Sequence, residues 1–200
     1  MEEKLTENFW NQRYLDGKIG WDLGSPTPIF NQWIKGIKTK STICVLGCGY
    51  GHDVMNFASY GHSVYAVDFA EKPIDIINKK KSEKKLNVYT IQSDIFRLPY
   101  IYNEFFDYIV EYTCYCAISV DDRENYMLLV DRLLKKTGKF VGIFFPVGKK
   151  KDEGGPPYGV DIKKTTELFH RKFNILTLGE SNLTIPPRLG RELYFEMKKK

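Results

Sequence analysis

Short runs of apolar residues alternate along the chain with longer segments in which apolar residues recur every three or four positions. The first pattern predicts buried strands and the second predicts amphipathic helices. Strands are expected at residues 43–46, 63–67, 88–91, 105–110, 138–145, 173–178 and 192–197. Helices are expected at residues 7–16, 28–37, 51–59, 121–136 and 161–170, with a further helix that carries Pro73 in its first turn and reaches about Lys84.

This order of elements predicts the fold class. Strands that alternate with helices form a mostly parallel, doubly wound sheet with helices on both faces, so the chain is expected to be an α/β protein. The last two strands are joined by residues 179–190, where no helical pattern occurs. Such a link suits a hairpin, so one strand near the C-terminus is expected to run antiparallel. The chain of 200 residues fits a single domain, 1–200.

A glycine-rich turn follows the first expected strand. Gly47, Gly49 and Gly51 stand at alternate positions before a helical segment, and the next strand ends in Asp68. Glycines let a ligand approach the backbone, a helix N-terminus offers free N–H groups, and an acid at this position accepts hydrogen bonds from ribose hydroxyls. The order strand, turn, helix, strand and acid therefore predicts a nucleoside cofactor, although a tight turn of an ordinary α/β protein has the same glycines.

Large aromatic residues precede the first strand of the sheet. Trp10, Tyr14 and Trp21 come before or within a loop rich in Gly and Pro, residues 20–28. Side chains of this size either fill the edge of the core or cover a bound ligand.

Composition and charge exclude several classes of protein. The net charge is +5, and the lysines gather in short runs with no basic stripe interleaved with aromatic residues, so nucleic acid is not expected as a partner. The acidic start, residues 1–4, lacks the apolar region of a signal peptide, and no segment has the length of a membrane span. The expected location is the cytoplasm.

The four cysteines and three histidines do not form a metal-binding pattern. No cysteine pair has CxxC spacing, and the cysteines at 44, 48, 114 and 116 are expected to be reduced, with packing as the main role of the last two. The histidines at 52, 62 and 170 are scattered and are expected to be structural or exposed. Arg188, between two prolines and a glycine, is expected in a surface turn rather than as a guide for anions.

Four stretches carry a resemblance to a known family. They are Trp21-Asp22-Leu23-Gly24 with Thr27-Pro28, Leu46-Gly47-Cys48-Gly49 with Gly51-His52-Asp53, Cys116-Ala117-Ile118, and Gly154-Gly155-Pro156-Pro157-Tyr158. In these the chain resembles the thiopurine methyltransferase family of class I methyltransferases, and within it the halide/thiol methyltransferase branch. The resemblance implies a Rossmann-like fold with an N-terminal helical lid at residues 1–40. It also implies S-adenosyl-L-methionine as donor and S-adenosyl-L-homocysteine as product.

The resemblance also implies roles for individual residues. The backbone at Gly47 and Gly49 would approach the methionyl part of the donor, Asp68 would hold its ribose, and Asp94 and Ile95 would meet its adenine. Glu111 and Tyr112 would flank the cofactor near its sulfonium, and the aromatic residues Trp10, Tyr14 and Trp21 would cover it. Tyr158 could donate its hydroxyl to the acceptor or pack in a rigid turn. The residues expected to wall the acceptor are Trp21, Tyr115, Ile118 and Phe145.

The implied reaction is the transfer of a methyl group to a small thiol or halide, such as hydrosulfide, methanethiol, thiocyanate or iodide. Aromatic faces attract the cationic sulfonium, and in-line displacement chiefly requires that the two reacting atoms be held in line. A soft anion needs no general base, and the sequence shows no Ser/His/Asp set. The enzyme is expected to act as a monomer.

Three alternatives remain open at this point. The acceptor could instead be a thiopurine-like aromatic thiol or a selenium or tellurium species. The chain could be a nucleoside-binding module without catalytic activity. A nicotinamide dehydrogenase is ranked last, because the Gly-x-Gly-x-x-Gly form of the turn is absent.

Overall fold

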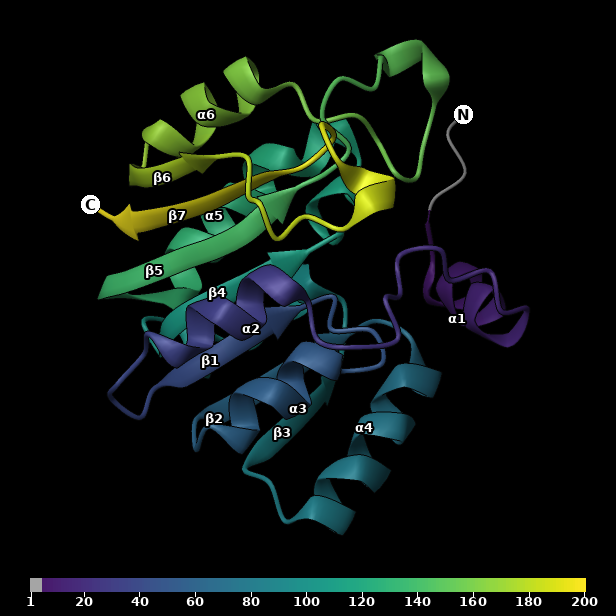
Figure 1. The fold of residues 1–200 in the computed structure, drawn as a ribbon, viewed down its shortest axis with the longest axis vertical. Helices are drawn as coiled ribbons and strands as arrows, with labels where there is room; N and C mark the ends of the chain where they lie inside the picture. The colour runs from purple at the N-terminus through teal and green to yellow at the C-terminus, as the bar shows by residue number, and fades with distance from the viewer. Residues whose placement is uncertain (1–4) are drawn as a thin grey trace.

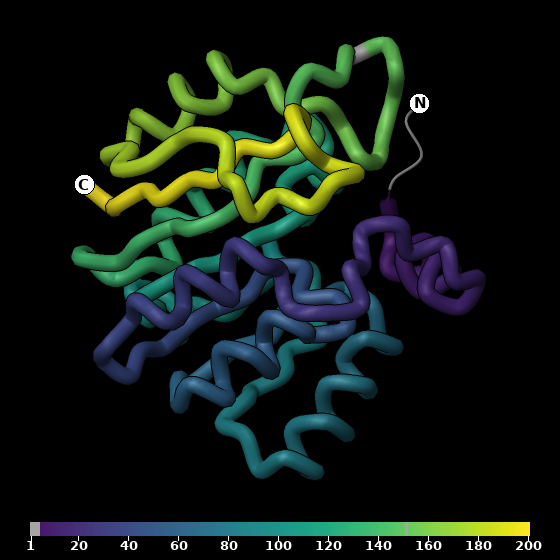
Figure 2. Tube along the Cα trace, in the orientation of Figure 1, coloured from purple at the N-terminus to yellow at the C-terminus, as the bar shows by residue number. Residues whose placement is uncertain are grey.

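The computed structural model describes residues 5–200, and the expectation for residues 1–4 lies outside this range. Its centre is a seven-stranded sheet of order β3-β2-β1-β4-β5-β7-β6 (Figures 1 and 2). The strands are β1 (Thr42–Leu46), β2 (Ser63–Asp68), β3 (Val88–Gln92), β4 (Phe106–Tyr112), β5 (Leu134–Phe144), β6 (Phe173–Gly179) and β7 (Leu193–Lys199). The first five are parallel, and β7 runs antiparallel to both of its neighbours, which confirms the expected sheet and closing hairpin.

Helices cover both faces of this sheet (Figure 1). They are α1 (Glu7–Leu15), α2 (Pro28–Lys35), α3 (His52–Ser59), α4 (Glu71–Lys84), α5 (Arg123–Leu133) and α6 (Ile162–His170). Apolar residues of α2, α3 and α4 pack on one face around Val45, Val64 and Val110. Residues of α5 and α6 pack on the other face around Phe140 and Phe195. Within residues 5–200, no helix is long and apolar enough to cross a membrane.

The expected helix 121–136 is too long at both ends. It begins at Arg123 and ends at Leu133, and β5 begins at once with Leu134, which pairs with Phe106 of β4. Leu134 is fully buried, so tertiary pairing decides the conformation of a segment whose local pattern is helical. The early start of β5 is the main difference between the expected and observed elements.

The N-terminal segment divides into two parts with different surroundings. In α2, Ile29, Phe30 and Ile34 are buried against the sheet, so this helix belongs to the core. By contrast α1 lies beyond the carboxyl ends of the strands, next to α4 (Figure 1). We call residues 7–27, which comprise α1 and the loop after it, the N-terminal cap.

Gly142, near the C-terminal end of β5, offers a test of how tightly the sheet is packed. A Cβ there would lie 2.5 Å from the Phe195 ring and 2.8 Å from the Glu111 carbonyl oxygen. Overpacking of this kind costs about 1–3 kcal/mol. Gly142→Ala is therefore expected to lower the free energy of unfolding by this amount in urea denaturation.

Gly179→Ala is the matched control, because a Cβ at this strand end meets nothing within 4 Å. It should change the free energy of unfolding by less than about 0.5 kcal/mol. Equal stability of the two variants would contradict the tight packing at Gly142.

Candidate active site

The turn after β1 is held by the glycines that the sequence singled out. Gly47, Gly49 and Gly51 have φ values of 62°, 51° and 72°, which favour glycine. A Cβ on Gly47 would lie 2.9 Å from the Cys114 side chain, and one on Gly51 would lie 2.6 Å from Ile77. Packing inside the protein therefore requires two of these glycines. At Gly49 the nearest atom is the Tyr14 hydroxyl oxygen, 3.4 Å from such a Cβ, so this position faces the cap.

Asp68, at the end of β2, fastens the glycine turn to the next strand. Its Oδ2 accepts a hydrogen bond from the Gly49 backbone N–H at 2.8 Å, and its Oδ1 accepts one from the Ala70 N–H at 3.0 Å. Burial raises the pKa of this carboxyl, and these two backbone donors partly offset that effect. Each carboxylate oxygen retains a second lone pair, which leaves both oxygens able to accept from ribose hydroxyls.

The ends of β2 and β3 lie together beside this carboxylate. The Ser93 N–H donates to the Asp68 carbonyl oxygen at 3.0 Å. Asp94 follows at the start of a short 3-10 turn, where its Oδ1 accepts from the Phe96 N–H at 3.0 Å, and Ile95 is buried. Asp94 and Ile95, which are expected at the adenine, thus follow β3. This strand lies next to β2, which carries Asp68, the residue expected at the ribose.

Glu111 lies near the end of β4. One of its carboxylate oxygens accepts a hydrogen bond, and the other has no hydrogen-bond partner among the described residues. The side chain is 1 % exposed, and its Oε2 accepts from the Tyr115 N–H at 3.0 Å. Within residues 5–200 no hydrogen-bond partner is present for Oε1. Burial raises the pKa of this carboxyl to about 7. An unpaired buried oxygen of an acid is suited to a cationic or hydrogen-donating ligand.

Aromatic rings of the cap cluster above the glycine turn. The Trp21 ring lies 5.5 Å from the centroids of both Trp10 and Tyr14, and Tyr14 lies 5.2 Å from Tyr50 of the turn. Tyr14 is only 5 % exposed. The structure thus brings together the three aromatic residues that the sequence predicted to cover a ligand.

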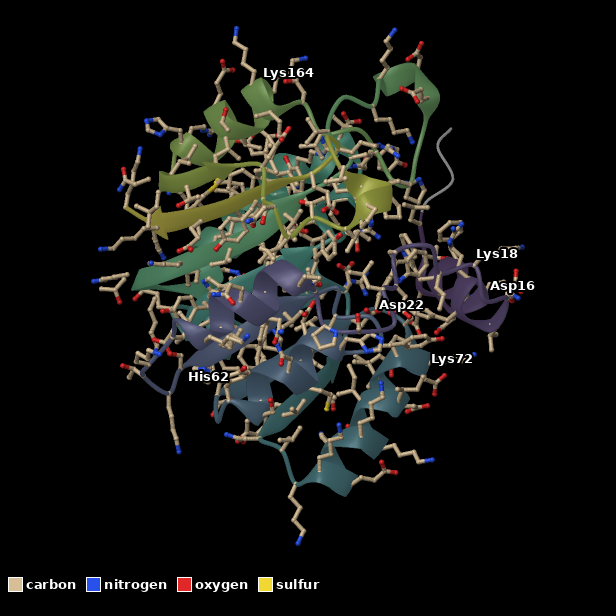
Figure 3. The ribbon with its side chains drawn as sticks, viewed as in Figure 1. Asp16, Lys18, Asp22, His62, Lys72 and Lys164 are labelled. Atoms are coloured by element: carbon tan, nitrogen blue, oxygen red, sulfur yellow. The ribbon has the colours of Figure 1, made fainter. Side chains whose placement is uncertain are left out.

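The ties of α1 to α4 are polar. The Glu71 N–H donates to Asn11 Oδ1 at 2.9 Å, and Lys72 Nζ donates to the Tyr14 carbonyl oxygen at 3.2 Å. Figure 3 shows Lys72 on the part of α4 nearest to the cap. A further polar contact ties α1 to the end of β3, where Gln92 Nε2 donates to Glu7 Oε1 at 3.2 Å.

The loop of the cap is tied to the start of α3. Asp53 accepts from both the backbone N–H and the hydroxyl of Thr27, each at 2.8 Å, and burial raises the pKa of this carboxyl to about 6. His52 Nε2 lies 3.1 Å from Asp22 Oδ1, and Figure 3 shows Asp22 between α1 and the sheet. His52 thus has the structural role expected for it. A cavity of about 60 Å³ remains between this loop and the glycine turn.

Of the residues expected at the acceptor, Tyr115 and Tyr158 have different surroundings. Tyr115 is 1 % exposed, packs against the rings of Tyr126, Phe144 and Phe169, and has its hydroxyl 3.5 Å from Thr165. It therefore belongs to the core rather than to a pocket wall.

The half-buried Tyr158 is positioned by its backbone. Its N–H donates to the Cys116 carbonyl oxygen at 2.7 Å, and its ring packs so closely on Gly155 that a Cβ there would overlap it. The loop after β5 is in this way fixed to the loop after β4, on the carboxyl side of the sheet.

The four cysteines are free, as expected, and Cys114 and Cys116 are buried. Burial raises the pKa of the Cys116 thiol to about 12 and that of Cys114 well above its usual value. Both thiols are therefore protonated and unreactive at neutral pH, in agreement with the packing role predicted for them.

Arg188 corrects an expectation drawn from the sequence. It was expected in an exposed turn, but it is 6 % exposed and lies beneath the cap loop. Its guanidinium stands 4.8 Å from the ring centroids of both Tyr112 and Phe145. Flanking Pro and Gly residues fix the turn, but only contacts with distant segments bury the charge.

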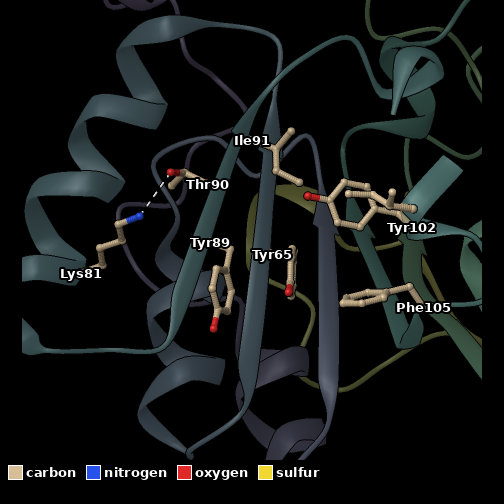
Figure 4. A pocket seen from close by; sticks show the side chains of 8 residues that line it. Tyr65, Lys81, Tyr89, Thr90, Ile91, Tyr102 and Phe105 are labelled. Atoms are coloured by element: carbon tan, nitrogen blue, oxygen red, sulfur yellow. Dashed lines mark hydrogen bonds between the residues drawn. The ribbon is translucent and has the colours of Figure 1, made fainter. Parts of the chain in front are cut away.

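A wider hollow lies on another part of the sheet (Figure 4). It measures about 490 Å³ and shares no lining residue with the cavity at the glycine turn. Figure 4 shows Tyr65 and Tyr89 side by side on neighbouring strands, and their rings stack with centroids 4.6 Å apart. The connection between β3 and β4 contains two 3-10 turns in place of an α-helix, which leaves this face open.

Comparison with known proteins agrees with this geometry. The model of the family described as thiopurine S-methyltransferase matches residues 5–197. The chain belongs to the thiopurine S-methyltransferase family. It is 29% identical to a probable thiol methyltransferase 2 of Arabidopsis thaliana, over 95% of this chain and 84% of that protein. It is also 29% identical to thiocyanate methyltransferase 1 of Brassica oleracea, over 100% and 88% of the two chains. Identity to a thiopurine S-methyltransferase of Acinetobacter baylyi is 24%, over 88% and 89%.

Solved structures share the class I methyltransferase fold. One is the Burkholderia thailandensis 1,6-didemethyltoxoflavin-N1-methyltransferase with bound S-adenosylhomocysteine, at a TM-score of 0.79 and 18% identity over 97% of this chain and 87% of that one. Another is a TehB-like methyltransferase of Corynebacterium glutamicum, at a TM-score of 0.70 and 20% identity over 97% and 98%. As a member of the family, the chain is an S-adenosylmethionine-dependent methyltransferase. The dehydrogenase and the non-catalytic module are therefore discarded.

The residues of this methyltransferase fit its cofactor. The lone pairs of Asp68, the unpaired Oε1 of Glu111 and the cap-facing Gly49 all lie at the carboxyl end of the parallel strands. A cavity of about 60 Å³ is far smaller than the roughly 300–1,000 Å³ of ligand pockets. In this structure the cap loop thus lies close over the glycine turn.

The raised pKa of Glu111 predicts that binding of the donor releases protons. A cation near this carboxylate favours its ionised form, so the pKa falls from about 7 and a proton leaves at pH 6.5. Calorimetry of S-adenosylmethionine binding in two buffers of different ionisation enthalpy should give different apparent enthalpies.

Two variants test the source of this proton. Glu111→Gln should remove the difference between buffers. Asp53→Asn should keep it, because that buried carboxyl bonds to Thr27. Proton release that persists in Glu111→Gln would show that another group supplies the proton.

Proposed function

We propose that this enzyme transfers the methyl group of S-adenosylmethionine to a small thiol or halide, such as hydrosulfide, methanethiol, thiocyanate or iodide. The observation that carries the proposal is the packing of side chains around Tyr112, at the end of β4. There the buried Arg188 is sandwiched between the Tyr112 and Phe145 rings, beside the buried Glu192. This packing leaves little space for a large acceptor next to the end of β4. The names of the plant relatives, thiol and thiocyanate methyltransferases, support the same class of acceptor.

In the proposed arrangement the protein binds and orients the donor and the acceptor, and it excludes water from them. Asp68 holds the ribose, Asp94 and Ile95 meet the adenine, and the backbone at Gly47 and Gly49 approaches the methionyl part. Glu111 and Tyr112 lie near the sulfonium, and the rings of Trp10, Tyr14 and Trp21 close over it, where their faces attract the cation. The bound donor supplies an activated methyl group. Closure of the cap removes water from the acceptor anion.

Tyr158 is proposed to contact the acceptor. The backbone hydrogen bond to Cys116 keeps its loop beside the end of β4, where the acceptor is proposed to bind. An acceptor that enters as an anion needs no proton removed, so a side-chain base is not part of the proposal. Tyr115, which is buried in the core, is not included.

A thiopurine-like acceptor is the second candidate, favoured by the bacterial relatives at 24% identity. An aromatic thiol of that size would require more space beside Tyr112 than the cavity of about 60 Å³ provides. The two candidates are separated by an assay with labelled donor against hydrosulfide, methanethiol, thiocyanate, iodide and a thiopurine. Transfer to the small acceptors is expected, and transfer to the thiopurine alone would overturn the proposal.

We also propose that the enzyme acts as a monomer in the cytoplasm. Four free thiols suit a reducing compartment.

Asp68→Asn is expected to weaken the binding of S-adenosylhomocysteine at least tenfold. The substitution removes the charge that strengthens the hydrogen bonds to the ribose, each worth about 1.5–3 kcal/mol, and keeps an acceptor for the buried Gly49 N–H. Titration calorimetry measures the change. The exposed Asp75→Asn on α4 is the control and should bind as tightly as the wild type. Unchanged affinity of Asp68→Asn would remove this residue from the site.

Tyr158→Phe is expected to lower kcat for iodide or thiocyanate roughly tenfold, because one hydrogen bond to the acceptor is lost. Affinity for S-adenosylhomocysteine should stay the same, since Tyr158 is proposed to contact the acceptor and not the donor. Tyr100→Phe, at a side chain that is 83 % exposed, is the matched control. Full activity of Tyr158→Phe would assign Tyr158 to packing alone.

A further inference from the structure

A buried ion pair joins two residues of the C-terminal hairpin. Arg188 ends a short 3-10 turn (Pro186–Arg188), and Glu192 stands just before β7. Arg188 Nη1 lies 3.4 Å from Glu192 Oε1, and the two side chains are 7% and 2% exposed. Burial of two charges is costly, so such a pair persists only where further hydrogen bonds satisfy it.

The other partners of this pair lie in segments far away in the sequence. Arg188 Nη2 donates to the carbonyl oxygens of Gly20 at 3.4 Å and Trp21 at 3.2 Å, both in the cap loop. The Tyr112 hydroxyl, at the end of β4, donates to Glu192 Oε1. The pair thus connects the cap loop, the central sheet and the C-terminal hairpin.

These contacts also leave Arg188 poorly suited to binding a substrate anion. Glu192 neutralises its charge, both terminal nitrogens are engaged by protein acceptors, and the two ring faces cover the guanidinium plane. Each terminal nitrogen of Arg188 thus already donates to an acceptor within the protein. A side chain engaged in this way fixes the segments that it bonds.

We propose that Arg188 is a positioning residue that holds the cap loop against the end of β4 and so sets the Trp21 ring over the cofactor. Each carbonyl that it bonds belongs to Trp21 or to the residue before it. Without these bonds the loop opens more often, and the enzyme binds its donor more weakly. The effect on donor binding rests on the proposed function, whereas the effect on the loop does not.

Two variants keep the fold while they remove these bonds. Arg188→Lys keeps the positive charge beside Glu192, but a single ammonium cannot reach Glu192 and two carbonyls as the planar fork does. The double variant Arg188→Met/Glu192→Gln removes both charges at similar volume, which avoids an unpaired buried charge. Arg191→Lys is the matched control, because Arg191 stands on the same turn, packs its guanidinium 5.3 Å from the Phe145 centroid and is exposed.

The first measurement is amide hydrogen exchange of residues 17–27, followed by mass spectrometry. Both Arg188 variants should exchange at least about tenfold faster in this segment, while β5 and β7 exchange as in the wild type and Arg191→Lys is unchanged. Wild-type exchange of the loop in both variants would overturn the proposal. So would faster exchange spread evenly over β5 and β7, which is the result of a purely structural role.

The second measurement is steady-state kinetics with iodide and labelled donor. KM for the donor should rise at least about tenfold in Arg188→Lys, with a smaller change in kcat. A fall in kcat at constant KM would contradict positioning of the cap. If the wild type transfers methyl groups to none of the small acceptors, the proposed function fails, and the exchange experiment still decides the role of Arg188 at the loop.

Discussion

The position of β1 inside the sheet, between β2 and β4, is the constraint on which the site depends. The chain builds outwards from β1 to β3 and then returns to the other side of β1 with β4. The parallel strand ends diverge at this reversal, which is where ligands bind in open α/β sheets. The glycine turn, Asp68 and Glu111 all meet there because each follows or ends one of these three strands.

Two buried carboxyl groups give this point its electrostatic character. Burial raises the pKa of both Asp68 and Glu111, and backbone N–H groups rather than basic side chains satisfy them. The Arg123 guanidinium offsets only part of this effect at Glu111, so a cation that enters beside these acids stabilises their ionised forms. The site is therefore suited to a positively charged donor before any specific contact is considered.

The cap depends on attachments at both ends of its loop. Asp53 holds Thr27 at the start of α2, and Arg188 holds Gly20 and Trp21 near the end of α1. Between these points the loop covers the glycine turn. The attachments are polar and specific, whereas α2 beyond them is bound by apolar burial. This contrast separates a segment that can open from one that belongs to the core.

The sequence by itself determined the elements whose signals are local. Apolar periodicity located nearly every strand and helix, and the glycine turn, Asp68 and the cap aromatic residues were found from spacing and residue type. Tertiary structure decided what depends on distant partners. Leu134 is a strand residue because it pairs with Phe106, and Tyr115 is buried because α6 covers it. Arg188 is buried because Tyr112, Phe145 and the cap loop surround it, and no pattern within its own turn encodes those contacts.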